Sequence, residues 1–157
     1  MSLRRVAVLA LFAFITAAAR AESEVPIAEI LERTEAPAGV VFELVESDRD
    51  ALRHLIPQVR RHVEALRERF PGLPIAVVSH GNEQFGLARE RAGELSGLHE
   101  EVQRLTGEAE VPVHVCGAYA QMHGVDEEDF PEYVDVAPAG PVQIRNYEQL
   151  GYLRVQL

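Results

Sequence analysis

The stretch GVVFELVESDRDALRHLIPQVRRHVEALRERFPGLPIAVVSHGN, residues 39–82, decides the fold class. Its first part, residues 39–45, is a short apolar and β-branched run that predicts a strand. Apolar side chains then recur at three- and four-residue spacing from Leu52 to Phe70, which predicts a long helix with one apolar face. A second apolar run at residues 74–79 predicts another strand. A strand, a helix and a strand in this order are typical of a parallel pair joined by a crossover helix.

The long helix carries signals at its start, within it and at its end. Ser47, with Asp50 three residues later, predicts a helix N-cap followed by an acidic first turn. Pro57 lies inside the apolar stripe, so we expect it to kink the helix or to reset its start. Pro71 and Gly72 predict its end.

The same alternation of strands and helices continues through the rest of the chain. Further strands are predicted at residues 111–115, 133–137 and 152–156, and further helices at 85–91, 97–105, 117–123 and 141–150. The strands are continuous apolar runs, as expected when helices cover both faces of a sheet. This order predicts an α/β fold with a parallel sheet between two layers of helices.

The first 21 residues have the features of a secretory signal peptide. Arg4 and Arg5 precede an apolar run at residues 6–19, and residues 19–21 fit a small-x-small cleavage pattern. The run is too short to cross a bilayer as a helix, and a retained N-terminal anchor is the alternative. We therefore expect cleavage near Ala21 and export to a bacterial periplasm, then an extended leader at 22–38 with a helical turn at 27–31, and one domain at 39–157.

The chain is acidic and contains no lysine. Its net charge is −10, and loss of the first 21 residues would remove three arginines and no acid, which gives about −13. This charge argues against nucleic acid and anionic lipid as partners, so we expect no membrane contact after cleavage. Without lysine, the chain has no Schiff-base residue and no phosphate-loop lysine.

Cys116 is the only cysteine, so an internal disulfide is excluded. In an exported protein, a single cysteine indicates intermolecular pairing or a free thiol with a function. The alternative is a buried cysteine that packs as a small hydrophobic side chain. The cysteine count leaves both interpretations open.

The position of Cys116 nevertheless favours a site. Ligands of parallel sheets bind beyond the carboxyl ends of the strands, and Cys116 ends a predicted strand where a helix begins. A helix N-terminus favours the thiolate form of a cysteine. His80 ends a different strand and could converge on the thiol, and His114 shares a strand face with Cys116, so either could assist the thiol. For His114 the alternative is a hydrogen-bonded histidine of the sheet. The remaining candidates at this edge are ligand-binding residues, namely Gly81, Asn82 and Gly117.

Other chemistries lack their sequence signatures. No glycine-rich turn follows the first strand, so no nicotinamide or flavin fingerprint is present, and there is no G-x-S-x-G elbow. Cys116 and the histidines at 80, 114 and 123 do not follow a compact metal-ligand spacing. We therefore predict no cofactor and no metal, with a metal- or haem-associated accessory protein as the weakest hypothesis.

Several segments together resemble the DsrE/DsrF-like family over residues 39–157. They are VVSHG at 77–81, VHVCG at 113–117, GV at 124–125, DF at 129–130, VDVAPAG at 134–140 and LGY at 150–152. The resemblance implies a three-layer α/β/α fold with a five-stranded, mainly parallel sheet. It also implies a homo-oligomer, whether dimer, trimer or hexamer.

In sulfur-relay members of this family, a cysteine in the segment matching Cys116 carries a persulfide. Together with the expected export, the resemblance therefore implies a periplasmic sulfur-handling protein in which Cys116 accepts sulfur from a donor and passes it to an acceptor. Its partners would be a donor or acceptor protein or a small sulfur species. The chain departs from the well-known members in its expected export, because those act in the cytoplasm. The alternative is a non-catalytic homo-oligomeric module that binds a small ligand, with Cys116 structural.

Overall fold

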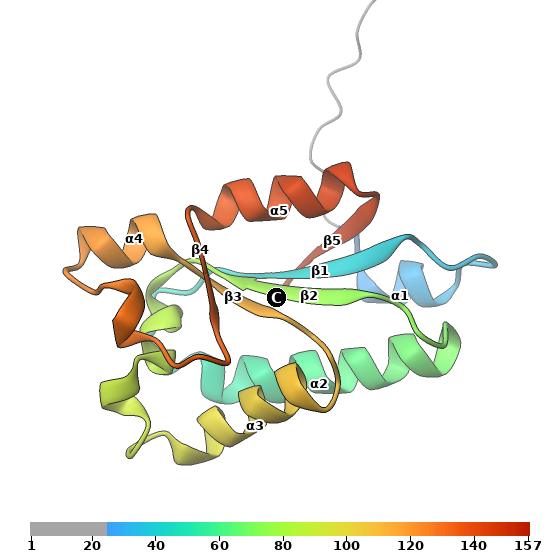
Figure 1. Ribbon diagram of the computed structural model, residues 1–157. Coiled ribbons are helices and arrows are strands. Elements are labelled where there is room, and N and C mark those ends of the chain that lie inside the picture. Colours follow the sequence, from blue (N-terminus) through green and yellow to red (C-terminus); the bar gives the residue numbers. More distant parts are fainter. Residues whose placement is uncertain (1–24) are drawn as a thin grey trace, which may run out of the picture.

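The computed structural model describes residues 25–157, and the expected signal peptide lies outside this part of the chain. Five strands form one sheet in the order β4-β3-β2-β1-β5, and every neighbouring pair is parallel (Figure 1). The strands are β1 (Gly39–Leu44), β2 (Ile75–Ser79), β3 (Val113–Cys116), β4 (Asp135–Ala137) and β5 (Tyr152–Gln156). The predicted α/β fold with a parallel sheet is confirmed.

Helices cover both faces of this sheet, which gives three layers (Figure 1). The α-helices are α1 (Ile27–Leu31), α2 (Leu52–Arg69), α3 (Ser96–Gly107), α4 (Gly117–Met122) and α5 (Gly140–Gln149). Helices α2 and α3 lie on one face, and α5 lies on the other. Three short 3₁₀ helices complete the described part of the chain, namely η1 (Asn82–Leu87), η2 (Arg89–Arg91) and η3 (Glu127–Asp129).

The two faces of the sheet differ in character because side chains alternate along each strand. In β1, Val40, Phe42 and Leu44 join the large core beneath α2 and α3. On the α5 face the apolar core is much smaller, and is formed by buried Val41, Ala76, Val78 and Ile144. The α5 face therefore has room for polar side chains, and the candidate site lies there.

Helix α2 begins later than predicted. Its N-cap is Ala51, and no side chain caps it. The preceding turn is instead closed by Asp48, whose carboxylate accepts the Asp50 N–H at 2.9 Å. The prediction that Ser47 caps the helix is wrong, because this local turn takes up the residues between β1 and Ala51. Pro57 neither ends nor restarts the helix, which is continuous from Leu52 to Arg69.

The predicted helix at residues 85–91 is a pair of 3₁₀ segments. Their bonds join residues three apart, as from the Gln84 N–H to the Gly81 carbonyl and from the Ala88 N–H to the Phe85 carbonyl. The side chains of Glu83 and Gln84 are tied to strand ends, and this anchoring holds the segment away from a regular α-helix.

The segment expected as an extended leader packs against the domain from Val25 onward. Ile30 of α1 is fully buried in the large core. The Val25 N–H donates to the Arg154 carbonyl at 3.0 Å, and the Arg69 guanidinium donates to the Leu31 carbonyl at 3.2 Å. Over residues 25–157, none of the helices combines the length and the apolar character needed to cross a membrane.

Candidate functional site at the carboxyl edge of the sheet

The carboxyl ends of β1 to β4 and the residues that follow them form one end of the molecule, here called the carboxyl edge (Figure 1). Cys116 is the last residue of β3 and the N-cap of α4. Its Sγ accepts the Tyr119 N–H at 3.4 Å, and the residue is 5% exposed. The thiol therefore lies at a strand-to-helix junction, as predicted.

The main chain of Cys116 is held on both sides by one buried amide. Gln84 Oε1 accepts the Cys116 N–H at 2.7 Å, and Gln84 Nε2 donates to the Cys116 carbonyl at 3.3 Å. Gln84 itself is fully buried. A paired contact of this kind fixes both position and orientation, so Gln84 sets where the sulfur lies.

A fully buried carboxylate, Glu83, joins the ends of β1 and β2. It accepts the Ser79 hydroxyl at 2.7 Å, the Gly81 N–H at 2.9 Å and the Glu46 N–H at 2.6 Å. Gly81 leaves no room for a larger residue, because an added Cβ would lie 2.3 Å from Glu83 Oε2. Gly81 thus shapes this edge by permitting close approach.

His80 lies beside Cys116. Val78 is paired with His114 and Ser79 with Val115, and the next step in this parallel register places His80 next to Cys116. A Cβ added to Gly140 would lie 2.5 Å from the His80 Cβ and 3.4 Å from the Cys116 Cβ. The start of α5 therefore packs against both residues, and only glycine fits there.

The imidazole of His80 is bound to a buried carboxylate. Its Nε2 lies 2.8 Å from Glu43 Oε1, and the other oxygen of Glu43 accepts from Arg154 Nε. Burial by itself would raise the pKa of the Glu43 carboxyl. The hydrogen bond from His80 and the positive charge of Arg154 outweigh burial and hold that pKa below its usual value. Glu43 is therefore ionised at neutral pH.

His114 shares the sheet face of Cys116, but its ring is engaged elsewhere. Nε2 lies 2.8 Å from the Tyr147 hydroxyl on α5, and Nδ1 lies 3.8 Å from Asp135 on β4. Burial lowers the pKa of His114, and Asp135 opposes this only in part. The ring is thus neutral at pH 7 and serves to join the sheet to α5.

Asn82 and Gly117 hold the loops around the thiol. Asn82 Oδ1 accepts the Tyr119 hydroxyl at 2.8 Å, and its Nδ2 donates to the Ser47 carbonyl at 3.1 Å. A Cβ on Gly117 would lie 3.1 Å from the Ala137 carbonyl oxygen. Both residues lie at the site as predicted, and their observed contacts are within the chain.

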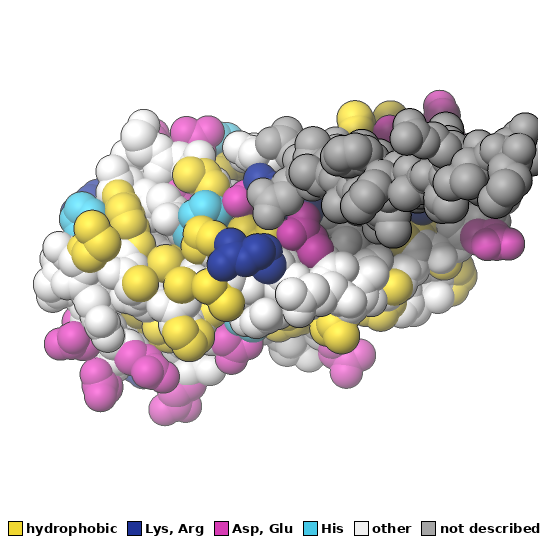
Figure 2. Space-filling model, turned by 90° about the horizontal axis from the view of Figure 1, so that it is seen from above, with side chains coloured by type: hydrophobic (Ala, Val, Ile, Leu, Met, Phe, Trp, Pro, Cys, Tyr) yellow, Lys and Arg dark blue, Asp and Glu magenta, His cyan; other side chains and the backbone are white. Residues whose placement is uncertain are grey.

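Apolar side chains are exposed around the carboxyl edge. Val45 follows β1, Val142 lies in the first turn of α5, and Met122 on α4 is 80% exposed. Figure 2 shows hydrophobic side chains gathered over α4 and the beginning of α5. Beneath them, the rings of Phe85, Tyr119 and His123 pack together.

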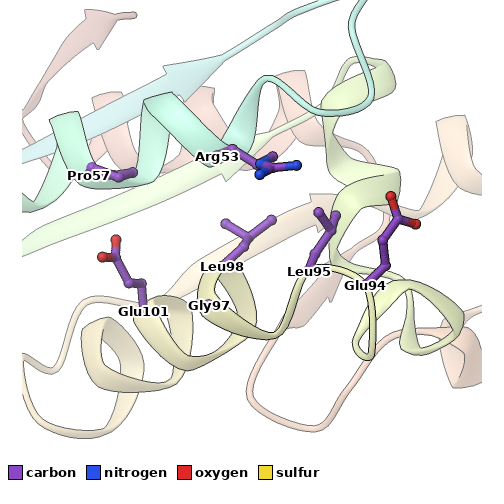
Figure 3. A pocket seen from close by; sticks show the side chains of 7 residues that line it. All are labelled: Arg53, Pro57, Glu94, Leu95, Gly97, Leu98 and Glu101. Carbon is purple, nitrogen blue, oxygen red and sulfur yellow. The ribbon is translucent and has the colours of Figure 1, made fainter.

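Among the hollows in the described part of the chain, two lie on opposite faces of the sheet. The first, of about 240 Å³, lies between α2 and α3 on the far face of the sheet. Figure 3 shows Arg53 and Pro57 of α2 facing Leu98 and Glu101 of α3 across it. The second, of about 140 Å³, lies under α5 and is lined by Glu43, Pro141, Ile144, Arg145, Glu148 and Arg154. Within residues 25–157, no three metal-ligating side chains gather closely enough to hold an ion.

Sequence reasoning missed four residues of this site, namely Glu43, Glu83, Gln84 and Arg154. Two of them carried a signal: a charged residue inside an otherwise apolar strand, as in GVVFELV and YLRVQ, indicates a buried partner. Glu83 and Gln84 follow a turn and have no such pattern, so only the structure identifies them.

No protein-family model matches the chain, and no curated protein matches it in sequence. Solved structures do resemble it. MTH1491 from Methanobacterium thermoautotrophicum, a protein of unknown function, is 29% identical, with a TM-score of 0.60 over 75% of this chain and 97% of its own. The YchN protein of E. coli is 16% identical, with a TM-score of 0.55 over 76% of this chain and 99% of its own. The five-stranded parallel sheet with helices on both faces is thus the DsrE-like α/β fold of these two proteins.

Proposed function

We propose that this chain is an exported sulfur carrier in which Cys116 holds a persulfide. The observation that carries the proposal is the place of the thiol in a DsrE-like fold: Cys116 lies at the carboxyl edge, is fixed by Gln84 and adjoins His80. A fixed thiol beside an imidazole is the arrangement that activates cysteine nucleophiles. The expected signal peptide supports a periplasmic location for this reaction.

The transfer is an exchange between sulfur atoms without net oxidation. The Cys116 thiolate attacks the outer sulfur of a donor persulfide R–S–SH, so that a new S–S bond forms and the donor's S–S bond breaks. The products are Cys116–S–SH and R–S⁻, which takes up the proton that the Cys116 thiol lost. An acceptor thiolate then attacks the outer sulfur of Cys116–S–SH in the same way and restores the thiol.

The experiment that tests this proposal is mass spectrometry of the intact protein. The mature chain is incubated with polysulfide, beside Cys116→Ser. We expect wild-type protein to gain the mass of one or more sulfur atoms, a reductant to remove the gain, and the variant to gain none. A thiol that takes up no sulfur, and that an alkylating probe reaches only after unfolding, would contradict the carrier.

A second candidate is a non-catalytic homo-oligomeric module in which Cys116 packs as an apolar residue. It is favoured by the 5% exposure of Cys116 and by the apolar side chains around the carboxyl edge. Analytical ultracentrifugation tests the oligomer, with Met122→Glu as the variant that should weaken an apolar interface. An intact oligomer with an inert thiol would support this module over the carrier.

Export is tested on the same chain. Expressed in full in a Gram-negative host, the protein should be recovered from the periplasm with its first residue near Glu22. Recovery of uncleaved protein in the membrane fraction would instead favour a retained anchor.

A further inference from the structure

We propose that Glu43 and Arg154 are positioning residues of the Cys116 site, which hold the His80 imidazole so that its Nδ1 takes the thiol proton. This inference rests on the proposed carrier function, because it concerns the same thiol. It adds two residues from the opposite half of the sheet to the chemistry of that thiol.

The contacts form one polar chain across the α5 face of the sheet. Arg154 on β5 contacts Glu43 on β1, Glu43 contacts His80 at the end of β2, and His80 adjoins Cys116 on β3. In the strand order β3-β2-β1-β5, Cys116, Glu43 and Arg154 lie on β3, β1 and β5, and His80 directly follows β2. The sheet and the residue that follows β2 therefore connect the guanidinium to the thiol.

The contact with Glu43 selects the state of the imidazole. An ionised carboxylate can only accept, so Nε2 must carry the hydrogen that it shares with Glu43 Oε1. In the neutral ring the other nitrogen, Nδ1, is then the base. Among the described residues His80 has no second side-chain hydrogen bond, so Nδ1 is left for a proton. A carboxylate that fixes the imidazole in this way is the orienting element of histidine-assisted nucleophiles.

The charges around His80 are nearly balanced. They comprise Glu43 on β1, Arg154 on β5 and Cys116 on β3, with Arg145 and Glu148 of α5 lining the hollow beside Glu43. The positive charge of Arg154 helps to keep Glu43 ionised.

The Glu43–Arg154 pair is buried among apolar side chains, at a position where two apolar residues would also fit. Glu43 is 6% exposed, and its neighbours on this face, Val41, Ala76 and Val78, are all apolar and buried. A buried ion pair is weak support for stability, because desolvation offsets most of its attraction. The hollow of about 140 Å³ under α5 reaches both Glu43 and Arg154, and so leads from the surface to the pair.

The proton is accounted for at each step. The Cys116 S–H proton passes to His80 Nδ1, the thiolate attacks the outer sulfur of the donor persulfide, and the imidazolium returns the proton to the departing R–S⁻. The sum is Cys116–SH plus R–S–SH giving Cys116–S–SH plus R–SH, with no oxidant or reductant required.

The test measures how the rate of Cys116 alkylation by a small neutral probe depends on pH. Glu43→Gln keeps the shape of the side chain and removes its charge, and we expect the midpoint of the rate profile to rise by about one pH unit, so that alkylation near pH 7 slows about tenfold. His80→Ala should slow alkylation at least as much, and Glu43→Gln should add no further loss in the His80→Ala background. Glu64→Gln, which removes a carboxylate from an exposed pair with Arg60, should leave the profile unchanged.

A purely structural pair would give a different result. Glu43→Gln would then lower stability and leave the midpoint where it is, and that outcome overturns the inference. So does a wild-type thiol that reacts only after unfolding. A shifted midpoint in a protein that takes up no sulfur from polysulfide would contradict the carrier function and leave this inference standing.

A measurement on the wild-type protein covers the case in which Glu43→Gln does not fold. Nitrogen NMR of labelled histidine distinguishes the two neutral forms of the ring. We expect His80 to carry its hydrogen on Nε2 with Nδ1 unprotonated, and the opposite form would overturn the inference.

Discussion

Gln84 shows how much of this site depends on a single side chain. Its amide accepts the Cys116 N–H and donates to the Cys116 carbonyl. A buried N–H or carbonyl without a partner costs free energy comparable to a lost hydrogen bond. The position of the sulfur and the stability of the edge are therefore set by the same residue.

We accordingly expect Gln84→Leu to lower the free energy of unfolding by about 1 to 3 kcal/mol, because it removes two buried hydrogen bonds to the Cys116 main chain. Urea unfolding measures the change. Gln121→Leu, on the exposed side of α4, is the matched control and should change it by less than about 0.5 kcal/mol. Equal effects of the two substitutions would contradict this role for Gln84.

At the scale of elements, helix α5 depends on Gly140 for its contact with the sheet. Gly140→Ala would place a Cβ against the Cβ of His80, and neither main chain can yield easily. We expect a loss of about 1 to 3 kcal/mol of unfolding free energy from this overlap, together with slower alkylation of Cys116. Gly97→Ala in α3, where no atom lies within 4 Å of the added Cβ, should change stability by less than about 1 kcal/mol. A Gly140→Ala protein with unchanged stability and an unchanged rate of Cys116 alkylation would contradict this role, because it would show that α5 can shift without cost.

The elements also show what can be predicted from the sequence. Apolar periodicity located all five strands, and it located the α-helices that cover the sheet, because it reflects the burial that each element needs. The start of α2 was missed because a local turn, in which Asp48 accepts the Asp50 N–H, precedes it. The 3₁₀ segments were missed because they depend on long-range hydrogen bonds, such as the one that Glu83 accepts from the Glu46 N–H. Cys116 and His80 were predicted to lie close together because strand ends converge. Glu43 and Arg154 were not, because their pairing depends on β5 lying beside β1.

For the whole molecule, buried titratable groups set the pH range of stability. Burial is the largest cause that lowers the pKa of His62, His99 and His114. As pH falls below about 6.5, the unfolded chain takes up protons that these folded rings resist, so stability falls. The lowered pKa of Glu43 extends this loss to more acidic pH, since stability from Glu43 is present above the usual glutamate pKa and is lost below it. At the alkaline end, burial raises the pKa of Tyr133 and Tyr147, so stability falls above about pH 10.

Urea midpoints measured from pH 5 to 8 check this dependence. We expect the midpoint to fall steadily below pH 6.5, and His114→Gln to reduce the slope by up to one proton. The exposed His54 serves as control, and His54→Gln should leave the slope unchanged. A flat profile between pH 7 and pH 5 would contradict the assignment of neutral buried histidines.

The Glu43–Arg154 pair also has a consequence for biosynthesis. The two residues are 111 positions apart, and β5 is the last of the five strands along the described chain. At ribosomal rates of about 5 to 20 residues per second, Arg154 is synthesised roughly 5 to 20 s after Glu43. During that interval we expect the Glu43 carboxylate to remain hydrated, because burying it without a charged partner in an apolar sheet would cost free energy. Completion of the proton path to Cys116 is therefore among the last events of folding, and a chain stalled before β5 would carry a thiol without it.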